Sequence, residues 1–210
     1  MDPAESSPRI LDNVDRFGLA AIARMICDFL PANEQEAADR DFILQRFARD
    51  PSVLERSSFA HVTVSAWTVD PAFERVLLIY HNLYDSWGWV GGHADGDDDL
   101  QSVALRELAE ETGVENARVV SVGLGDLLSL EVLTVDGHEK RGKYVSSHLH
   151  LNITYLVVAD PAQSIRIKAD ENSGVKWVPL DDILTLSSEP WMCDRVYRKL
   201  IDKTRSLKGA

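Results

Sequence analysis

The chain has 210 residues, enough for one well-packed core with an accessory element but short for two full enzyme domains. Its composition, 45% hydrophobic and 27% charged, is that of a globular protein, and no apolar run reaches the about 20 residues that span a bilayer. The formal net charge of -12 disfavours a nucleic-acid partner, because phosphate backbones are bound by clustered Lys and Arg. The amino terminus lacks the basic start and apolar stretch of a secretory signal, so we expect a cytoplasmic protein without membrane contact.

A helical hairpin is predicted over residues 11–49. Apolar residues recur at helical spacing from Leu11 to Leu30, and Pro31 ends that pattern. Asn33 followed by Glu36 resembles a capping box and predicts the start of a second helix, with Phe42 among its apolar residues. The apolar side of this hairpin must be buried, and three roles stay open: covering a pocket, extending the core, or forming a homodimer.

Short β-rich runs replace the helical pattern from about residue 59. Strands are expected at 61–67, 75–80, 119–122, 127–134, 146–158 and 175–178. A helix is predicted from Leu100 to Thr112, closed by Gly113, and a last helix from about Ser188. The last helix is expected to carry one apolar face, made of Trp191, Val196, Tyr197, Leu200 and Ile201. The predicted division is therefore a tail and hairpin over 1–58 and an α+β domain over 59–210.

Three carboxylates share one face of the predicted central helix. Glu107, Glu110 and Glu111 stand at i, i+3 and i+4, where unneutralised charges repel one another. A hard cation such as Mg²⁺ relieves that repulsion and keeps coordination positions open for phosphate oxygens. The preceding Gly91-Gly92 lets backbone approach such an ion closely. The alternative interpretation of the carboxylates alone is a solvated acidic helix face.

The complete string from Gly92 to Val114 resembles the Nudix box. That pattern is Gly, five residues, Glu, seven residues, Arg-Glu, an aliphatic, any residue, Glu-Glu, any residue, Gly and an aliphatic. The matching positions are Gly92, Arg106, Glu107, Leu108, Glu110, Glu111, Gly113 and Val114. The preceding Trp89-Val90-Gly91-Gly92 is similar to the family's aromatic-x-Pro-Gly-Gly, with Val90 in place of Pro. Asp98 replaces the first Glu of the box, which keeps the charge with a shorter reach.

The resemblance implies a fold and a set of roles. The fold would be an α/β/α sandwich with a mixed sheet, here with an N-terminal helical extension. Glu110 and Glu111 would be the principal metal ligands, together with the Gly91 carbonyl. Glu107 would be a further ligand or would orient the attacking water, and Arg106 would hold the loop to the helix. The implied ion is Mg²⁺, with Mn²⁺ as the alternative, and the implied reaction is attack of water on a diphosphate linkage.

The general base stays open between three glutamates. These are Glu107, Glu131 and Glu171.

Substrate contacts are sought outside the box. His148, His150 and Asn152 alternate along one predicted strand face, which is either a pocket wall or an exposed sheet face. Zinc binding by the two histidines is not favoured, because no third ligand lies near them in the sequence. Lys143, in a small basic loop, either meets a substrate phosphate or sits at a solvated hairpin tip. Trp87 either stacks on a flat group of the substrate or packs in the core.

The favoured function is Mg²⁺-dependent hydrolysis of a nucleoside diphosphate linked to another moiety, or of a related small diphosphate. One alternative is a Nudix-like ligand-binding module without catalysis. Another is an enzyme similar to isopentenyl-diphosphate isomerase, which depends on a catalytic cysteine and on a metal-binding cluster of histidines. Cys27 and Cys193 both fall in predicted helices outside the sheet and are interpreted as small buried hydrophobic residues, which argues against the isomerase.

Overall fold

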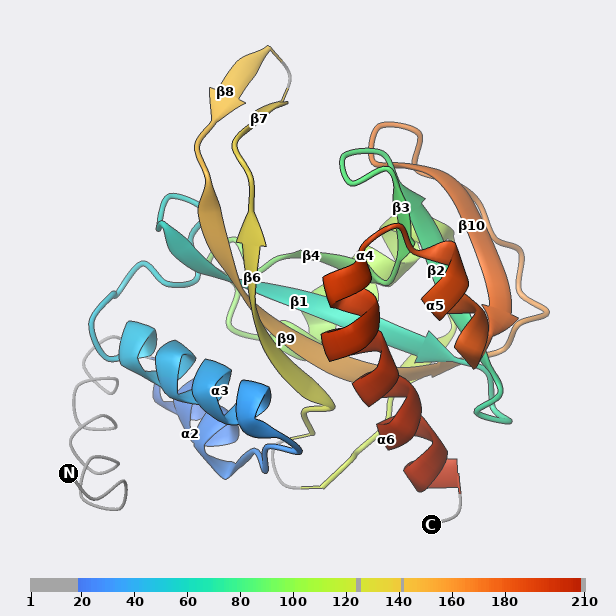
Figure 1. Ribbon diagram of the computed structural model, residues 1–210, viewed down its shortest axis with the longest axis horizontal. Coiled ribbons are helices and arrows are strands. Elements are labelled where there is room, and N and C mark those ends of the chain that lie inside the picture. The colour runs from blue at the N-terminus through green and yellow to red at the C-terminus, as the bar shows by residue number, and fades with distance from the viewer. Residues whose placement is uncertain (1–18, 124–125, 141, 209–210) are drawn as a thin grey trace. The chain divides into compact units, whose positions relative to one another are not determined.

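The structure, a computed structural model, describes residues 19–123, 126–140 and 142–208 (Figure 1). The beginning of the predicted first helix, residues 11–18, lies outside the described residues. The chain forms two compact units. The first comprises Met1–Thr63, His93–Asp98 and Gly123–Ile153, and the second comprises Val64–Gly92, Asp99–Val122 and Thr154–Ala210.

Helices α2 (Ala20–Asp28) and α3 (Glu34–Phe47) of the first unit confirm the predicted hairpin. The Asn33 side chain accepts a hydrogen bond from Glu36 N at 2.9 Å, as an N-cap does. The Glu36 carboxylate accepts a hydrogen bond from Ala32 N at 2.7 Å. Leu30 and Phe42, which the helical spacing counts among the apolar residues, are exposed. Helical spacing gives the direction of a side chain but not which neighbours cover it.

Helix α3 packs on strand β6 (Ser129–Val135), in the same unit (Figure 1). Asp39 accepts a hydrogen bond from Val132 N at 3.0 Å, and Gln35 donates to Leu130 O at 3.4 Å. These contacts fit the role of the hairpin as an extension of the core. Strand β6 pairs with β9 (His148–Ala159).

A small hairpin links these two strands, formed by β7 (His138–Lys140) and β8 (Lys143–Val145). It extends away from the ends of β6 and β9 (Figure 1). The sequence predicts neither of its strands. Three-residue strands with exposed polar side chains lack the alternating apolar pattern from which a strand is recognised.

The second unit is built on a sheet with the order β10-β2-β1-β9-β5, to which β1 and β9 contribute the parts beyond residues 63 and 153. The bounds are β1 (Ala60–Val69), β2 (Arg75–His81), β5 (Ala117–Val119) and β10 (Asn172–Pro179). Strand β3 (Ser86–Gly88) pairs antiparallel with β2, and β4 (Val90–His93) pairs with β1. Strand β5 begins two residues and ends three residues earlier than the predicted 119–122.

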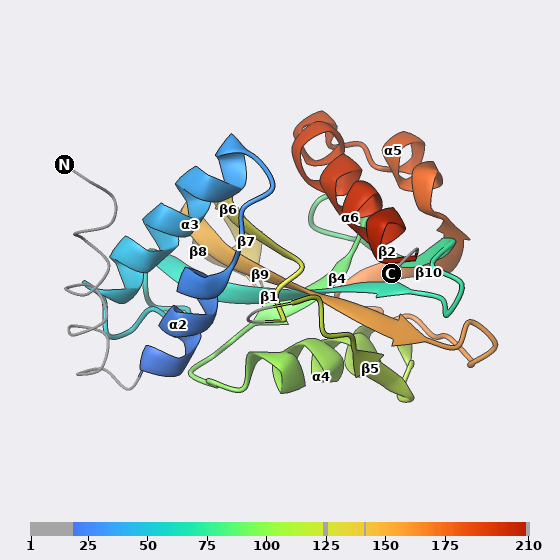
Figure 2. The same cartoon turned by 90° about the horizontal axis from the view of Figure 1, so that it is seen from below.

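Helix α4 (Leu100–Thr112) has the predicted bounds. Asp99 caps it by accepting from Ser102 N at 3.1 Å, and Gly113 ends it with a φ of 77°. Helix α4 lies on one face of the sheet of the second unit, while α5 (Ile183–Leu186) and α6 (Arg198–Lys208) lie on the other (Figure 2). The predicted α/β/α sandwich is therefore confirmed.

The last helix contains a π-helical turn, Met192–Tyr197, before α6. Val196 and Tyr197 are buried as predicted, but Trp191 is 49% exposed. The prediction for Trp191 was wrong because Trp191 stands five residues before Val196, and five residues of α-helix turn through about 500°, which puts the two side chains on different faces. Of the cysteines, Cys193 is buried in this turn and Cys27 is half-buried in α2.

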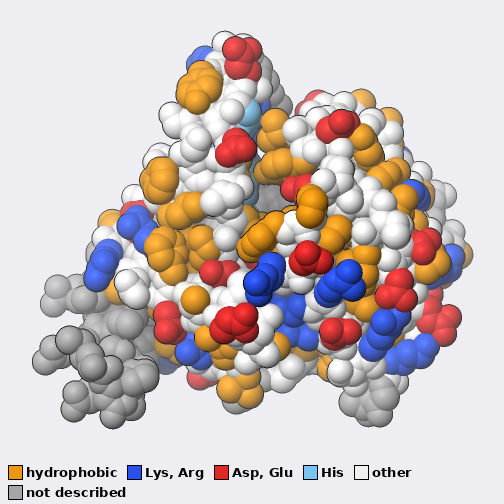
Figure 3. All heavy atoms as spheres, in the orientation of Figure 1, with side chains coloured by type: hydrophobic (Ala, Val, Ile, Leu, Met, Phe, Trp, Pro, Cys, Tyr) orange, Lys and Arg blue, Asp and Glu red, His pale blue; other side chains and the backbone are white. Residues whose placement is uncertain are grey.

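Among the described residues, no helix combines the length and the apolar character that a membrane span requires. On the face drawn in Figure 3, acidic and basic side chains are interspersed.

Candidate functional site

Three carboxylates meet in the second unit. Glu107 and Glu111 project from α4, and Glu171 precedes β10. One carboxylate oxygen from each lies within 4.8 Å of the other two. The helical spacing i, i+4 places the first two on one face of α4, and the chain entering β10 adds the third. We call this group the carboxylate cluster.

Two carboxylates of the cluster, Glu107 and Glu111, have raised pKa values. Burial raises the pKa of Glu111 to about 8, and the charges of Glu171 and Glu107 add to the effect, although a hydrogen bond from the Gly91 backbone opposes it. Burial likewise raises the pKa of Glu107, with Glu110 as the next cause. Ionised carboxylates this close and this buried are stabilised by a bound cation. Several oxygen donors with no soft ligand among them fit a hard divalent ion such as Mg²⁺ or Mn²⁺.

Glu110 and Lys168 lie beside this group. The Lys168 ammonium is 3.1 Å from Glu110 Oε2 and 3.0 Å from Glu171 Oε2. Burial alone would lower the pKa of Lys168, but its two carboxylate partners raise it above the ordinary value. Glu110 itself is half-exposed and is not one of the three clustered carboxylates. In this arrangement the lysine occupies the position of a counter-ion for Glu110 and Glu171.

The two glycines before α4 have different neighbours. A Cβ at Gly92 would overlap the Glu107 side chain, with Glu107 Cγ 2.6 Å away. A Cβ at Gly91 would lie 2.6 Å from the backbone oxygen of Val64 in β1. Both contacts are closer than a side-chain carbon tolerates, so the first glycine lets two backbones approach and the second makes room for Glu107.

Two motif residues lie at the surface. Arg106 is exposed on α4, and its charge opposes the rise in the pKa of Glu107. Asp98, the irregular box position, is exposed in the loop before α4.

Asn152 and Glu131 belong to a buried network in the first unit. Thr63 donates to Asn152 Oδ1 at 3.1 Å, and Asn152 Nδ2 donates to Glu131 Oε2 at 3.1 Å. The Ser129 hydroxyl contacts both Glu131 Oε1 and Glu36 Oε1, the latter at 2.8 Å. Glu36, Ser129 and Glu131 have no exposed surface. The amide of Asn152 and the carboxylate of Glu131 are thus engaged with each other inside the unit.

The other predicted substrate contacts lie apart from that network. Lys143 is exposed in β8, at the tip of its hairpin. Trp87 contacts Tyr80 edge to face, with ring centroids 5.4 Å apart, and Lys176 Nζ lies 3.9 Å from the centre of the Trp87 ring. One face of the indole is therefore covered by a cation from β10.

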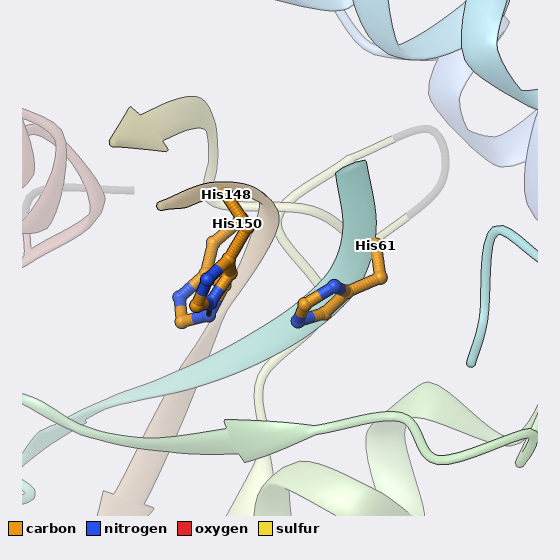
Figure 4. Close-up of side chains that lie close together, drawn as sticks. All are labelled: His61, His148 and His150. Atoms are coloured by element: carbon orange, nitrogen blue, oxygen red, sulfur yellow. Dashed lines mark hydrogen bonds between the residues drawn. The ribbon is translucent and has the colours of Figure 1, made fainter. Parts of the chain in front are cut away.

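Four histidines gather in the first unit. His61 comes from β1, His93 from β4, and His148 and His150 from β9 (Figure 4 shows three of them). The rings of His61 and His148 stack with centroids 5.1 Å apart, and the His93 ring lies 5.0 Å from the His150 ring. Burial lowers the pKa of His150 to about 2 and that of His93 to about 3, so both imidazoles are neutral at neutral pH.

His61 is the member that the sequence does not suggest. It stands 87 positions before His148. A backbone hydrogen bond from Leu149 N to Phe59 O, 2.9 Å long, brings the start of β1 beside the start of β9. The only sequence signal was the alternation of His61 with apolar residues, which is common to many half-buried strands.

The NUDIX domain family model matches residues 60–200, about two thirds of the chain. The chain therefore belongs to the Nudix family. The predicted family, the predicted fold class and the prediction that the chain is a Nudix hydrolase are confirmed. No curated protein matches the sequence.

Three solved structures illustrate the similarity. A C. elegans Ap4A hydrolase aligns at 19% identity and a TM-score of 0.50, covering 70% of this chain and 97% of its own. A NUDIX family hydrolase from Clostridium perfringens aligns at 19% identity and a TM-score of 0.47, covering 67% and 95%. The NUDIX domain of Shewanella oneidensis NrtR, complexed with ADP ribose, aligns at 22% identity and 0.47, covering 78% and 96%. The similarity to the C. elegans Ap4A hydrolase, at 19% identity, shows a shared fold.

Proposed function

We propose that this chain hydrolyses a diphosphate linkage in a nucleoside diphosphate joined to another moiety, or in a related small molecule, with Mg²⁺ as the cofactor. The observation that carries the proposal is the carboxylate cluster of Glu107, Glu111 and Glu171. Two of its members stand at matching positions of the Nudix box.

Glu107, Glu111 and Glu171 would hold the ion, and Glu110 and the Gly91 carbonyl complete the ligand set that the motif implies. When bound, Mg²⁺ or Mn²⁺ polarises a water and spreads the charge that develops on the phosphorus oxygens. The Gly91 backbone hydrogen bond fixes the Glu111 carboxylate. Glu110 is now paired with Lys168. It can join the ligand set because the long, flexible side chain of Lys168 can move away from it.

The proposed roles of the other residues rest on their surroundings. Glu107 and Glu171 stay candidates for the general base, because each belongs to the carboxylate cluster. Glu131 is better explained as a structural group, since it is buried and hydrogen-bonded to Asn152. Lys143 and Trp87 stay proposed substrate contacts. Asn152 is proposed to hold Glu131 in place. Its amide oxygen accepts a hydrogen bond from Thr63, and its amide nitrogen donates one to Glu131.

The test is a substrate panel with the purified chain and Mg²⁺, containing nucleotide sugars, dinucleoside polyphosphates, ADP-ribose, NAD-type compounds and nucleoside triphosphates. Glu107→Gln and Glu111→Gln should each lower kcat on the best substrate by on the order of 100-fold or more. Glu74→Gln, a matched change at an exposed glutamate paired with Lys208, should leave kcat unchanged. Turnover that survives both cluster substitutions would disprove the site.

The panel also separates the alternatives. Binding of a panel compound without turnover, under conditions where the chain is folded and Mg²⁺-loaded, would favour the ligand-binding module. The isomerase-like alternative is further weakened, because Cys27 lies in α2 and Cys193 in the π-helical turn. A homodimer, a cytoplasmic location and the absence of a nucleic-acid partner stay predictions.

A further inference from the structure

We propose that His61, His148 and His150 form a zinc site in the first unit, distinct in its ligands from the carboxylate cluster. The three side chains converge from two strands (Figure 4), and one ring nitrogen of each lies within 4.8 Å of the other two. The proposal goes beyond the hydrolase function and does not depend on it.

The protonation of His61 prepares it to bind a metal. Its Nδ1 lies 2.8 Å from the carbonyl oxygen of Ser58, and a carbonyl only accepts hydrogen bonds. Nδ1 therefore carries the hydrogen, and Nε2 presents a lone pair. That Nε2 atom is buried and has no hydrogen-bond partner among the described residues, while His61 as a whole is 2% exposed. An orphaned buried acceptor is costly, and a metal ion would satisfy it.

His148 is oriented in the same way. Its Nδ1 lies 2.8 Å from the Ser146 carbonyl oxygen, so its Nε2 also carries the lone pair. A metal-binding imidazole usually donates its other nitrogen to a carbonyl or carboxylate, which fixes the tautomer and the ring orientation. Both His61 and His148 show that arrangement.

The distance between two of the ligand atoms also fits zinc. His148 Nε2 and His150 Nε2 are 3.2 Å apart. Two imidazole nitrogens bound to tetrahedral zinc at about 2.0–2.1 Å are separated by about 3.3 Å. Without the ion, His150 Nε2 donates a hydrogen to His148 Nε2. When zinc binds, that hydrogen moves to His150 Nδ1, and no net proton is released.

The ligand chemistry selects the ion. Neutral imidazoles favour zinc and its transition-metal neighbours, whereas Mg²⁺ takes oxygen ligands. Three protein ligands leave a fourth position, as in sites where zinc holds a water or an anion. The His93 ring, 5.1 Å from the His61 ring, lines the site. The competing explanation is a packed group of imidazoles without any ion.

The experiment uses the full chain, stripped of metal with a chelator. Zinc is titrated and its stoichiometry measured, and Co²⁺ serves as a spectroscopic substitute, because tetrahedral cobalt absorbs visible light strongly and octahedral cobalt does not. We expect about one zinc per chain and a tetrahedral cobalt spectrum. His148→Asn should weaken zinc binding by on the order of 100-fold and abolish that spectrum. His81→Asn, which removes a histidine of the second unit, should change neither.

Two further variants keep the result interpretable. His150→Asn replaces a half-buried ligand and should behave as His148→Asn does, and circular dichroism establishes that each variant is folded. Glu111→Gln should keep the zinc and the cobalt spectrum, so that failure of the hydrolase proposal is separable from failure of this one. Substoichiometric zinc in the wild type, an octahedral cobalt spectrum, or unchanged binding in both folded histidine variants would overturn the proposal.

Discussion

Lys168 Nζ lies 3.1 Å from Glu110 Oε2, although the two residues are 58 positions apart in the chain. The same ammonium also contacts Glu171, which belongs to the carboxylate cluster. A lysine side chain thus supplies part of the positive charge that the metal would supply. The Lys168 ammonium and a bound metal ion therefore compete for the same carboxylates.

Replacing Lys168 with Met should therefore strengthen Mg²⁺ binding. We expect the Kd for Mg²⁺ to fall by about 3- to 10-fold, a modest change because the pair is partly exposed to water. The stability of the metal-free protein should fall slightly, since carboxylate repulsion is no longer relieved. Calorimetric titration measures the first effect and thermal unfolding the second. Lys208→Met, which removes an equal charge paired with Glu74, is the control, and equal shifts in both variants would contradict the explanation.

The two glycines before α4 should respond differently to the same change. Gly91→Ala places a carbon against the Val64 carbonyl, which is backbone and has little room to move, so we expect a loss of about 2–4 kcal/mol in the free energy of unfolding. Gly92→Ala displaces the Glu107 side chain, which can rotate, so stability should fall less while Mg²⁺-dependent turnover falls strongly. Chemical denaturation and activity measurements distinguish the two. The reverse order of stability losses would argue against these contacts.

Asp70 should make the stability dependent on acid. Burial would raise its pKa, but hydrogen bonds from the backbone of Arg75 and Glu74 and the Arg75 guanidinium outweigh it, so the pKa lies below the ordinary 3.8. A lowered folded-state pKa means stabilisation that is fully present well above pH 3.8 and is lost as the pH falls through the folded-state pKa. Asp70→Asn should cost about 1–2 kcal/mol at pH 7.

The difference between wild type and Asp70→Asn should shrink as the pH is lowered below about 4. Urea denaturation at several pH values measures it. Asp194→Asn, at an exposed aspartate paired with Arg198, should show little difference at any pH. A constant difference for Asp70→Asn across the range would show that its charge is not responsible.

Ser129 joins two buried carboxylates and should matter for stability. Its hydroxyl contacts Glu36 Oε1 and Glu131 Oε1, and neither carboxylate has exposed surface. Ser129→Ala leaves them facing each other without the shared hydroxyl, and we expect a loss of about 1–3 kcal/mol in the free energy of unfolding. Ser206→Ala, at an exposed serine bonded to Asp202 O, should cost about 0.5 kcal/mol or less. If Ser129→Ala and Ser206→Ala lowered the free energy of unfolding equally in denaturation experiments, the buried network would add no stability beyond that of an exposed serine hydrogen bond.

The central helix and the family could be predicted from the sequence because both depend on local features of the chain. The bounds of α4, its Gly113 end and the shared face of Glu107 and Glu111 all depend on residues within one or two helical turns. The same holds for the Asn33 cap of α3. Such features rest on backbone geometry and neighbouring side chains, which a sequence displays directly. The π-helical turn escaped prediction because nothing in the residue pattern marks the extra residue.

The composition of both side-chain clusters was decided by the tertiary structure. Glu171 joins Glu107 and Glu111, and His61 joins His148 and His150, only because segments remote in sequence lie together in the fold. The sequence likewise made Asn152 a candidate for meeting a ligand, while the structure buries it against Thr63 and Glu131. Alternation along a strand tells which residues share a face, but the packing of other elements decides whether that face meets water or a buried carboxylate.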